Sequence, residues 1–370
     1  MRGATAGAAQ LTRSFAACRL GDIALVGGKV ARLGELIHAG FPVPPGFVLG
    51  TDAYAGFLGS GPGAQLARML AATTGDDPAA LAAASRRIRD LIETSPVADA
   101  IAEQLALGYR RLAQAMGVDL ACVAVRSSAT SECLATHSFA GQQETWLWVK
   151  GTDALLARTR QCWSSLFTAQ AMAYRRSAGF PPERALIAVG VQAMVDARAA
   201  GVLFTLNPGN GDPSKIVIEA GWGFGESVVA GEVDPDRYLV DKVTLHLISA
   251  TIADKVCEYQ VDGELDAVRK MAVPAGRRTA PCLSAREVMA LAALAKRVER
   301  HFGVPQDIEW AIDRHAAFPG NIVLLQSRPE TTWNTRQPRP DTARPGAAVN
   351  YVMRALKGSA PANNAKGAMQ

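Results

Sequence analysis

Four short runs of the sequence place glycines and polar or charged side chains at spacings that could carry chemistry, and the first two could bind a phosphate group. The first is Gly27-Gly28-Lys29, in which paired glycines leave backbone amides open to an anion and a lysine adds positive charge at a helix start. The run is not a Walker A loop, because Ile23 stands where the first glycine of that motif should be. Taken alone, it is more typical of a plain turn before a helix.

The second run, VAVRSSAT at residues 123–130, predicts a strand that delivers an arginine into a group of hydroxyls. Arg126 could grip two phosphate oxygens at once, and Ser128 and Thr130 could donate hydrogen bonds to them. Gly141, in the polar loop that follows, could lay backbone amides over the same phosphates. The alternative is an arginine that pairs with a surface carboxylate beside a serine-rich turn.

The third run comprises two predicted strands near the end of the chain, DIEWAID at residues 307–313 and QSR at residues 326–328. Alternation along a strand puts Asp307 and Glu309 on one face, and Gln326 and Arg328 likewise share a face. Adjacent strands could then present two carboxylates, an amide oxygen and a guanidinium to one point. Hard oxygen ligands suit Mg²⁺, and the arginine suits a phosphoryl group in transfer. The alternative is a salt bridge between Glu309 and Arg328.

The fourth run is a glycine-punctuated acidic loop that begins at Glu219 and continues through residues 231–236. Catalysis and simple turn chemistry fit this run equally well.

The composition excludes several classes of protein. Hydrophobic residues make up 49% of the 370 residues and charged residues 20%, which is enough for a sizeable core. No run approaches eighteen apolar residues, so we expect no membrane span. Residues 1–333 carry 33 charges of each sign, which argues against nucleic-acid binding, and the net charge of +5 belongs to the residues beyond. The six cysteines form no CxxC pair, which favours reduced thiols and a cytoplasmic location.

The hydrophobic pattern predicts an α+β fold of two lobes that meet near residue 196. The expected helices cover residues 29–39, 81–93, 97–116, 153–177 and, after a capping box at Ser284 and Glu287, 284–302. The expected strands include residues 122–125, 185–195, 307–313 and 321–328. We therefore expect a flexible N-terminus (1–18), an N-terminal lobe (19–195), a C-terminal lobe (196–333) and a basic Pro- and Ala-rich tail (334–370).

Taken in order, these runs resemble the amino-terminal ATP-binding domain of the phosphoenolpyruvate synthase and pyruvate phosphate dikinase family, an ATP-grasp-type module. The resemblance covers residues 19–333 and takes in GGKVARLGELIHAGFPVPPGF, VAVRSSAT, SFAGQQET, VQAMV, FTLNP, IEAGWGFGESVVAGEVDPD, DIEWAID and LLQSRPETT. It implies a two-lobed fold with the ATP cleft between the lobes.

The resemblance also implies roles for individual residues, with ATP and Mg²⁺ as cofactors. Glu309 and Gln326 would coordinate Mg²⁺, helped by Asp307, and Arg328 would stabilise charge on the phosphoryl group. Glu309, Gln326 and Arg328 would thus be the catalytic set. The residues that would bind the phosphates, adenine or other parts of ATP are Lys29, Arg126, Ser128, Thr130, Gly141, Gln142, Gln192, Met194, Val195 and Glu219.

Members of this family pass the β-phosphoryl group of ATP to a histidine and leave AMP. None of the five histidines here lies in a glycine-rich loop like that of the family's carrier domain. We therefore expect an ATP-binding subunit of a split phosphotransferase with a histidine-bearing partner subunit, an arrangement most like phenylphosphate synthase acting on phenol. The alternatives are a split rifamycin-type phosphotransferase or water dikinase, and a non-catalytic ATP-sensing subunit.

Overall fold

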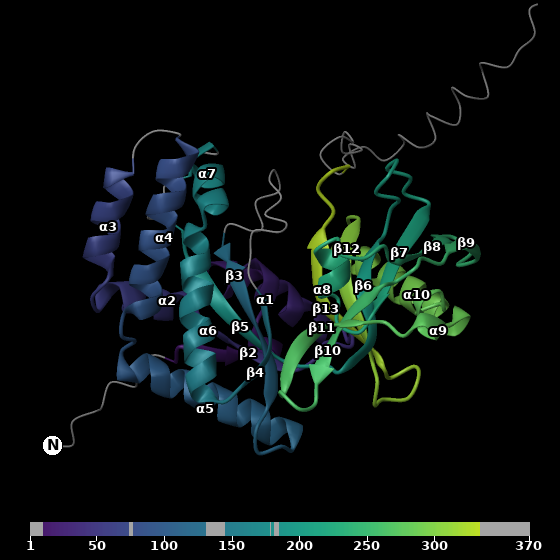
Figure 1. Cartoon of the computed structure of the whole chain (residues 1–370), viewed down its shortest axis with the longest axis horizontal. Coiled ribbons are helices and arrows are strands. Elements are labelled where there is room, and N and C mark those ends of the chain that lie inside the picture. Colours follow the sequence, from purple (N-terminus) through teal and green to yellow (C-terminus); the bar gives the residue numbers. More distant parts are fainter. Residues whose placement is uncertain (1–9, 74–76, 131–144, 178, 181–184, 334–370) are drawn as a thin grey trace, which may run out of the picture. The chain divides into compact units, whose positions relative to one another are not determined.

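The computed structural model describes residues 10–73, 77–130, 145–177, 179–180 and 185–333, which belong to one compact unit, Met1–Asn334. Helices and two large β-sheets make up this unit (Figure 1), which confirms the α+β prediction. The strands of the first sheet lie within residues 12–193, and those of the second within residues 197–329. The predicted tail and the loop with Gly141 and Gln142 lie outside the described residues.

The first sheet has five strands in the order β1-β2-β5-β3-β4, and all neighbouring strands are antiparallel. The central strand, β5, is buried along its whole length. The strands are β1 (Thr12–Ser14), β2 (Gly46–Leu49), β3 (Cys122–Ala129), β4 (Thr145–Lys150) and β5 (Ile187–Ala193).

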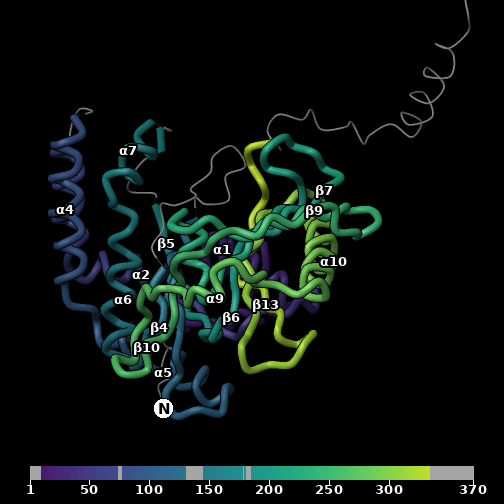
Figure 2. The backbone as a smooth tube through the Cα atoms, turned by 45° about the vertical axis from the view of Figure 1, so that its right-hand side comes forward, coloured from purple at the N-terminus to yellow at the C-terminus, as the bar shows by residue number. Residues whose placement is uncertain are grey.

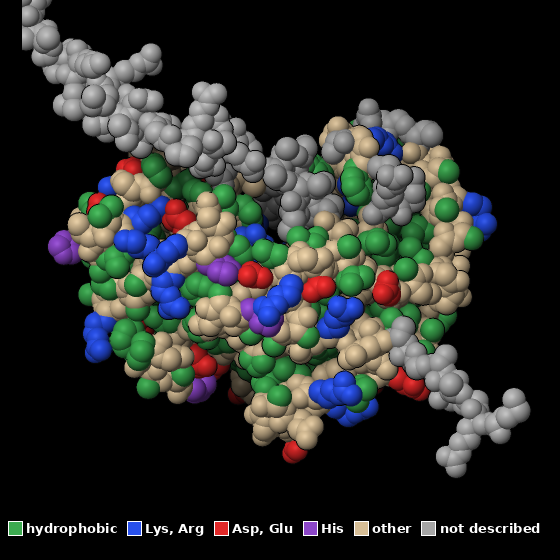
Figure 3. All heavy atoms as spheres, turned by 180° about the vertical axis from the view of Figure 1, so that it is seen from behind, with side chains coloured by type: hydrophobic (Ala, Val, Ile, Leu, Met, Phe, Trp, Pro, Cys, Tyr) green, Lys and Arg blue, Asp and Glu red, His purple; other side chains and the backbone are tan. Residues whose placement is uncertain are grey.

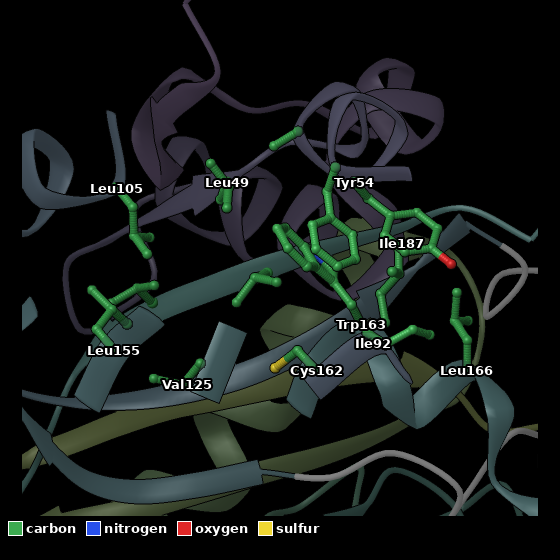
Figure 4. Packing of buried hydrophobic residues seen from close by; sticks show 14 of the residues in the cluster. Leu49, Tyr54, Ile92, Leu105, Val125, Leu155, Cys162, Trp163, Leu166 and Ile187 are labelled. Carbon is green, nitrogen blue, oxygen red and sulfur yellow. The ribbon is translucent and has the colours of Figure 1, made fainter. Parts of the chain in front are cut away.

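Helices cover both faces of this sheet. On one face, α1 (Ile23–His38) packs Val26, Val30 and Leu33 against β2 and β5. The opposite face carries the larger core, in which Trp163 stacks on Phe57 with ring centroids 4.6 Å apart and lies beside Tyr54 (Figure 4). The helices around this core are α2 (Thr51–Gly59), α3 (Gly63–Ala72), α4 (Pro78–Thr94), α5 (Asp99–Met116), α6 (Thr152–Ser164) and α7 (Ala169–Ser177).

The second sheet has six strands in the order β13-β12-β6-β7-β8-β9, again with antiparallel neighbours. Helix α10 (Ala285–Phe302) packs against one face of this sheet, near β7 and β12 (Figure 2), and begins with the predicted capping box. The strands are β6 (Ala197–Phe204), β7 (Lys215–Trp222), β8 (Asp236–Asp241), β9 (Leu247–Thr251), β12 (Gln306–Asp313) and β13 (Ile322–Pro329). The hairpin of β10 (Cys257–Asp262) and β11 (Ala267–Ala272) and the short helices α8 (Glu226–Val229) and α9 (Ala275–Arg278) complete this region.

A β-bulge in β13 decides which side chains face away from α10. Trp310 pairs with Leu324 but Glu309 pairs with Gln326, so Leu325 is the extra residue. Leu324 and Trp310 therefore stay in the core beneath α10, while Gln326 joins Glu309 on the opposite face. In a regular strand Leu324 and Gln326, two residues apart, would share a face, so the bulge at Leu325 is what places them on opposite faces.

The prediction of a flexible N-terminus over residues 1–18 is wrong for residues 12–18. Thr12 pairs with Leu49 in the first sheet, and Phe15 and Cys18 are buried against α1. Burial of the Phe15 ring and the ladder between β1 and β2 together offset the entropy cost of ordering this segment. Residues 1–9 lie outside the described part.

The single helix predicted over residues 153–177 is two helices. Helix α6 ends at Ser164, a 3-10 turn covers Ser165–Phe167, and α7 begins at Ala169. Thr168 between them has an extended backbone, with φ −59° and ψ 147°. The break lets Leu166 and Phe167 turn into the larger core of the first sheet.

The distribution of surface charge and the hydropathy of the helices both match what the composition predicted. On the face drawn in Figure 3, basic and acidic side chains lie interspersed over the described residues. Among those residues, we find no helix with the length and hydropathy that a membrane span requires.

Gly27 should be needed for the fold. Its φ of 72° and ψ of 169° interrupt α1, and an added Cβ would lie 2.0 Å from the carbonyl oxygen of Ser128. We expect Gly27→Ala to lower the free energy of unfolding by more than about 3 kcal/mol, since backbone strain and a backbone clash add. Gly40→Ala is the matched control, because Gly40 has a φ of 73° with nothing within 4 Å of an added Cβ. Gly40→Ala should lower the free energy of unfolding, measured by urea denaturation, by only about 1 kcal/mol. Equal losses would contradict this account.

Candidate functional site

Five of the predicted residues line one pocket. Its empty volume is about 250 Å³, part of it open to solvent. Phe15, Val30, Leu33 and Gly190 supply the apolar part of the wall. The predicted residues that line it are Lys29, Arg126, Ser128 and Gln192 from the first sheet and its helix α1, and Gln326 from the second sheet.

The first sheet holds its polar side chains on the face that carries α1. Arg126 pairs with Gly190, and Ser128 pairs with Ala188, so their side chains lie on the same face as the Ala188 methyl, which packs against α1. Ser128 Oγ accepts a hydrogen bond of 3.2 Å from the Val30 amide, and Lys29 Nζ donates one of 3.1 Å to the Ser127 carbonyl. Strand β3 and the first turns of α1 thus present a lysine and an arginine to the same pocket.

Arg126 connects the two sheets. Its Nη1 donates to Glu309 Oε2 and to the Leu325 carbonyl, each at 3.2 Å. The carbonyl belongs to the bulge residue of β13. The Arg126 Nε is buried and has no hydrogen-bond partner in the described part of the chain. The alternative for residues 123–130 was that Arg126 pairs with a surface carboxylate. Arg126 does pair with a carboxylate, but it is that of Glu309, which is itself a predicted site residue.

The carboxylates and Gln326 face this arginine from one side of the second sheet. Glu309 lies opposite Gln326 on β13 and opposite Val202 on β6, and Val202 lies opposite Glu219 on β7. Paired residues share a face, so these polar side chains form a row across the sheet on the side away from α10. Asp307, two residues from Glu309, belongs to the same face.

Arg328 pairs with Asp307 rather than with Glu309. Its Nε donates to Asp307 Oδ2 at 2.8 Å, and its Nη2 lies 2.7 Å from the same oxygen. This corrects the alternative of a salt bridge between Glu309 and Arg328, because the register places Asp307 directly opposite Arg328. Burial raises the pKa of Asp307, and the charge of Arg328 opposes that rise.

The donor set around Glu309 fits a magnesium ion. It offers two carboxylates, from Asp307 and Glu309, and the side-chain oxygen of Gln326 on facing strands. Within the described ranges, no group of three or more His, Cys, Asp or Glu side chains is placed to hold a metal ion. Magnesium commonly takes one or two carboxylates and completes its shell with phosphate oxygens and water, so the shorter set suffices.

The predicted adenine residues lie at and just beyond the end of β5. Gln192 is 2% exposed, and its Nε2 has no hydrogen-bond partner in the described part of the chain. Met194 and Val195 pack against an apolar cluster that includes Ala200, Phe224 and Ala311. This group therefore combines an apolar wall with an amide that can still donate, as a flat heteroaromatic ligand requires.

Thr130 does not join the pocket. Thr130 Oγ1 donates to the Leu186 carbonyl at 3.3 Å, and Thr130 is not among the residues that line the pocket.

Glu226 is a candidate site residue that was not predicted from the sequence. It is the first residue of α8, and its Oε2 is buried without a hydrogen-bond partner in the described part of the chain. Burial raises its pKa, while the charge of Arg126 lowers it and that of Glu309 raises it. Its place at a helix start after a glycine run was the available signal.

The side chains of the site have charges that suit a polyphosphate and a cation. Lys29 and Arg126 supply positive charge on one side, and Asp307, Glu309 and Gln326 supply oxygen ligands on the other. Arg328 adds a guanidinium beside the carboxylates. Charges arranged in this way are suited to phosphoryl transfer.

Comparison with known proteins also points to a nucleotide-binding domain. Residues 23–345 match the family described as pyruvate phosphate dikinase, AMP/ATP-binding domain. The chain is 42% identical over 338 residues to phosphoenolpyruvate synthase of Aeropyrum pernix, covering 85% of this chain and 41% of that protein. It is also 42% identical over 313 residues to a probable phosphoenolpyruvate synthase of Methanothermobacter thermautotrophicus, covering 84% and 44%. The chain thus spans about two fifths of the length of these relatives.

The raised pKa of Glu226 predicts a pH-dependent stability effect. The folded protein holds this proton to a higher pH than the unfolded chain, whose ordinary value is 4.5, so stability falls as pH rises through that window. Glu226→Gln does not ionise and should be more stable than the parent near neutral pH by about 1 kcal/mol, the scale of an unpartnered buried group. Urea unfolding should show the difference vanish at acid pH.

Glu232→Gln is the control of opposite sign. A hydrogen bond from Lys270 lowers the pKa of Glu232, so this carboxylate contributes stability near neutral pH that is lost as pH falls through its folded pKa. This variant should be less stable than the parent near neutral pH. A Glu226→Gln protein that is also less stable there would contradict the assignment.

Proposed function

Because the chain belongs to the family of pyruvate phosphate dikinase AMP/ATP-binding domains, we propose that its pocket binds MgATP and that its side chains promote transfer of the β-phosphoryl group to a histidine. The bond between the α- and β-phosphates breaks to release AMP, and the γ-phosphoryl group passes to water and leaves as inorganic phosphate. One observation carries the proposal. Asp307, Glu309, Gln326 and Arg328 share one face of the second sheet, and Arg126 reaches Glu309 from the first.

We propose further that the two sheets are the two lobes of an ATP-grasp-type module, over residues 19–195 and 196–333, with ATP between them. The division of the strands supports this, because no strand within the described residues is shared between the two large sheets. The pocket supports it too, since Lys29 and Arg126 come from the first part of the chain and Gln326 from the second.

In this proposal the phosphates take over the hydrogen bonds that Arg126 now makes. Arg126 leaves Glu309 and the Leu325 carbonyl and, with Lys29, holds the phosphate oxygens. Glu309, Gln326 and Asp307 would hold the cation, which would neutralise charge on the phosphates. Arg328 turns from Asp307 toward the phosphoryl group as its charge develops.

The remaining ATP-binding residues support the base and complete the site. Gln192 supplies an amide, and Met194 and Val195 supply an apolar wall for adenine. Ser128 lines the phosphate end, and Glu219 lies in the same row as Glu309. Thr130, Gly141 and Gln142 stay predictions for the loop that closes over the phosphates.

The proposal also concerns where the histidine is located and which molecule finally accepts the phosphoryl group. The relatives reported above are named phosphoenolpyruvate synthases, which favours a reaction of that type for the protein that contains this chain. A separate histidine-bearing partner subunit, phenol as acceptor and a cytoplasmic location rest on the sequence argument alone. Pyruvate and phenol, supplied in turn with a histidine carrier, would distinguish the two acceptors.

The direct test of the proposed transfer uses labelled ATP and asks where the label goes. The chain is mixed with the histidine-bearing domain of a phosphoenolpyruvate synthase relative and with ATP labelled at the β-phosphorus. We expect acid-labile label on that domain and stoichiometric AMP, because the transferred group is the β-phosphoryl. Formation of ADP, or tight ATP binding with no AMP under any condition, would reject the proposal and favour a kinase of another type or an ATP sensor.

The two arginines should separate binding from transfer. Arg328→Ala should leave ATP affinity within a few-fold and slow the transfer by roughly two to three orders of magnitude, the usual loss for one donor to a transition state. Arg126→Ala should instead weaken ATP binding, because its charge meets phosphates in the ground state as well. Isothermal titration and single-turnover rates measure the two effects.

Arg237→Ala is the matched control, because Arg237 lies opposite Glu219 at the outer end of the same row and bonds to Asn207. It should change neither quantity by more than a few-fold. Equal losses of ATP affinity in the Arg126 and Arg328 variants would refute the division of roles.

A further inference from the structure

A second arginine crosses from the first part of the chain to the strands of the proposed catalytic residues. Arg32 lies in α1, three residues after Lys29, and is 9% exposed. Its Nε donates to the Ser327 carbonyl at 2.8 Å, and its Nη2 donates to Gln306 Oε1 at 2.6 Å. The guanidinium carbon also lies 4.0 Å from the centroid of the Phe302 ring at the end of α10.

The acceptor Gln306 is itself fixed. Its side chain is fully buried, its Oε1 also accepts from Ser327 Oγ at 2.9 Å, and its Nε2 donates to the Val304 carbonyl at 2.8 Å. Its backbone amide donates to Thr205 Oγ1 at 2.8 Å, which joins β12 to the end of β6. A network so fully bonded transmits a displacement of Arg32 to both strands.

Each residue that Arg32 binds is the chain neighbour of a proposed catalytic residue. Gln306 precedes Asp307 on β12, Ser327 precedes Arg328 on β13, and Asp307 lies opposite Arg328. Asp307 and Arg328 bond to each other on the opposite face of the sheet from Ser327. The position of this pair therefore depends on the strand ends that Arg32 holds.

We propose that Arg32 is a positioning residue that fixes the Asp307–Arg328 pair relative to Lys29, and this rests on the proposed function above. Lys29 and Arg32 are three residues apart on one helix, so they lie on neighbouring positions of the same rigid surface. Lys29 lines the pocket and Arg32 does not. Arg126 exchanges its partners for phosphate, whereas Arg32 keeps its partners with or without nucleotide.

A lysine cannot replace this arginine in the role. The guanidinium presents Nε and Nη2 in a fixed plane to two acceptors on two strands, and an ammonium group has no such fork. Arg32→Lys keeps the positive charge but should lose the simultaneous grip on Ser327 and Gln306. Displacement of reacting groups by about 1 Å costs up to about a hundredfold in rate, which sets the size of the expected effect.

The kinetic arm measures AMP formation with the histidine-bearing domain of a phosphoenolpyruvate synthase relative, and ATP affinity by titration. Arg32→Lys should lower the single-turnover rate by roughly 10- to 100-fold while ATP affinity changes by less than about threefold. Gln306→Met removes one acceptor from the other side and should show the same split. Arg297→Lys is the matched control, because Arg297 stacks on Phe41 near the same helix ends, 5.0 Å from the ring centroid.

The structural arm needs no activity. Hydrogen exchange of the Arg32→Lys protein should be faster in residues 306–310 and 325–329 and unchanged in β5, because the tie holds β12 and β13 alone. Unchanged exchange in those strands, or an unchanged rate in folded Arg32→Lys or Gln306→Met protein, overturns the inference. A parent chain that forms no AMP rejects the proposed function and, with it, the role of Arg32 in positioning catalytic residues. The exchange result still decides whether Arg32 holds the strands.

Discussion

One extra residue in β13 decides whether the polar side chains of that strand meet Asp307 and Glu309. Because Leu325 interrupts the ladder with β12, Gln326 and Arg328 turn to the face that carries Asp307 and Glu309 instead of into the core beneath α10. The bulge also leaves the Leu325 carbonyl for Arg126, which comes from the first sheet. A local irregularity of the backbone thus adds Gln326 and Arg328 to the polar face and supplies an acceptor for Arg126.

The first sheet contributes by bringing α1 unusually close to β3. Gly27 makes the approach possible, and it places Lys29 and Arg32 on a helix that touches both sheets through hydrogen bonds. Two arginines then cross to the second sheet in different surroundings. Arg126 ends in the pocket, where we propose that it changes partners, whereas Arg32 ends among buried groups that also bond to one another. The contacts that we propose to change are thus made by Arg126 on β3, and those that we propose to stay fixed are made by Arg32 on the neighbouring helix α1.

Much of this could be predicted from the sequence, because strand alternation is local. Asp307 with Glu309, and Gln326 with Arg328, share faces as expected, and the capping box of α10 is confirmed. Which charges pair could not be predicted, since the partner of Arg328 depends on register. The order of residues 12–18 was missed because it comes from packing of Phe15 against distant segments, and Glu226 because its burial depends on the whole fold.

Under the proposed function, the contact between Arg126 and Glu309 would link the binding of nucleotide and of metal. In the structure the two side chains form an ion pair, so the positive charge of one compensates the negative charge of the other. A phosphate that draws Arg126 away leaves the Glu309 carboxylate to a cation, and a cation on Glu309 releases the guanidinium. Each ligand then raises the affinity of the other by the same factor, as reciprocity of coupled equilibria requires. If the pocket binds MgATP as proposed, this one ion pair would make nucleotide and metal heterotropic effectors of each other.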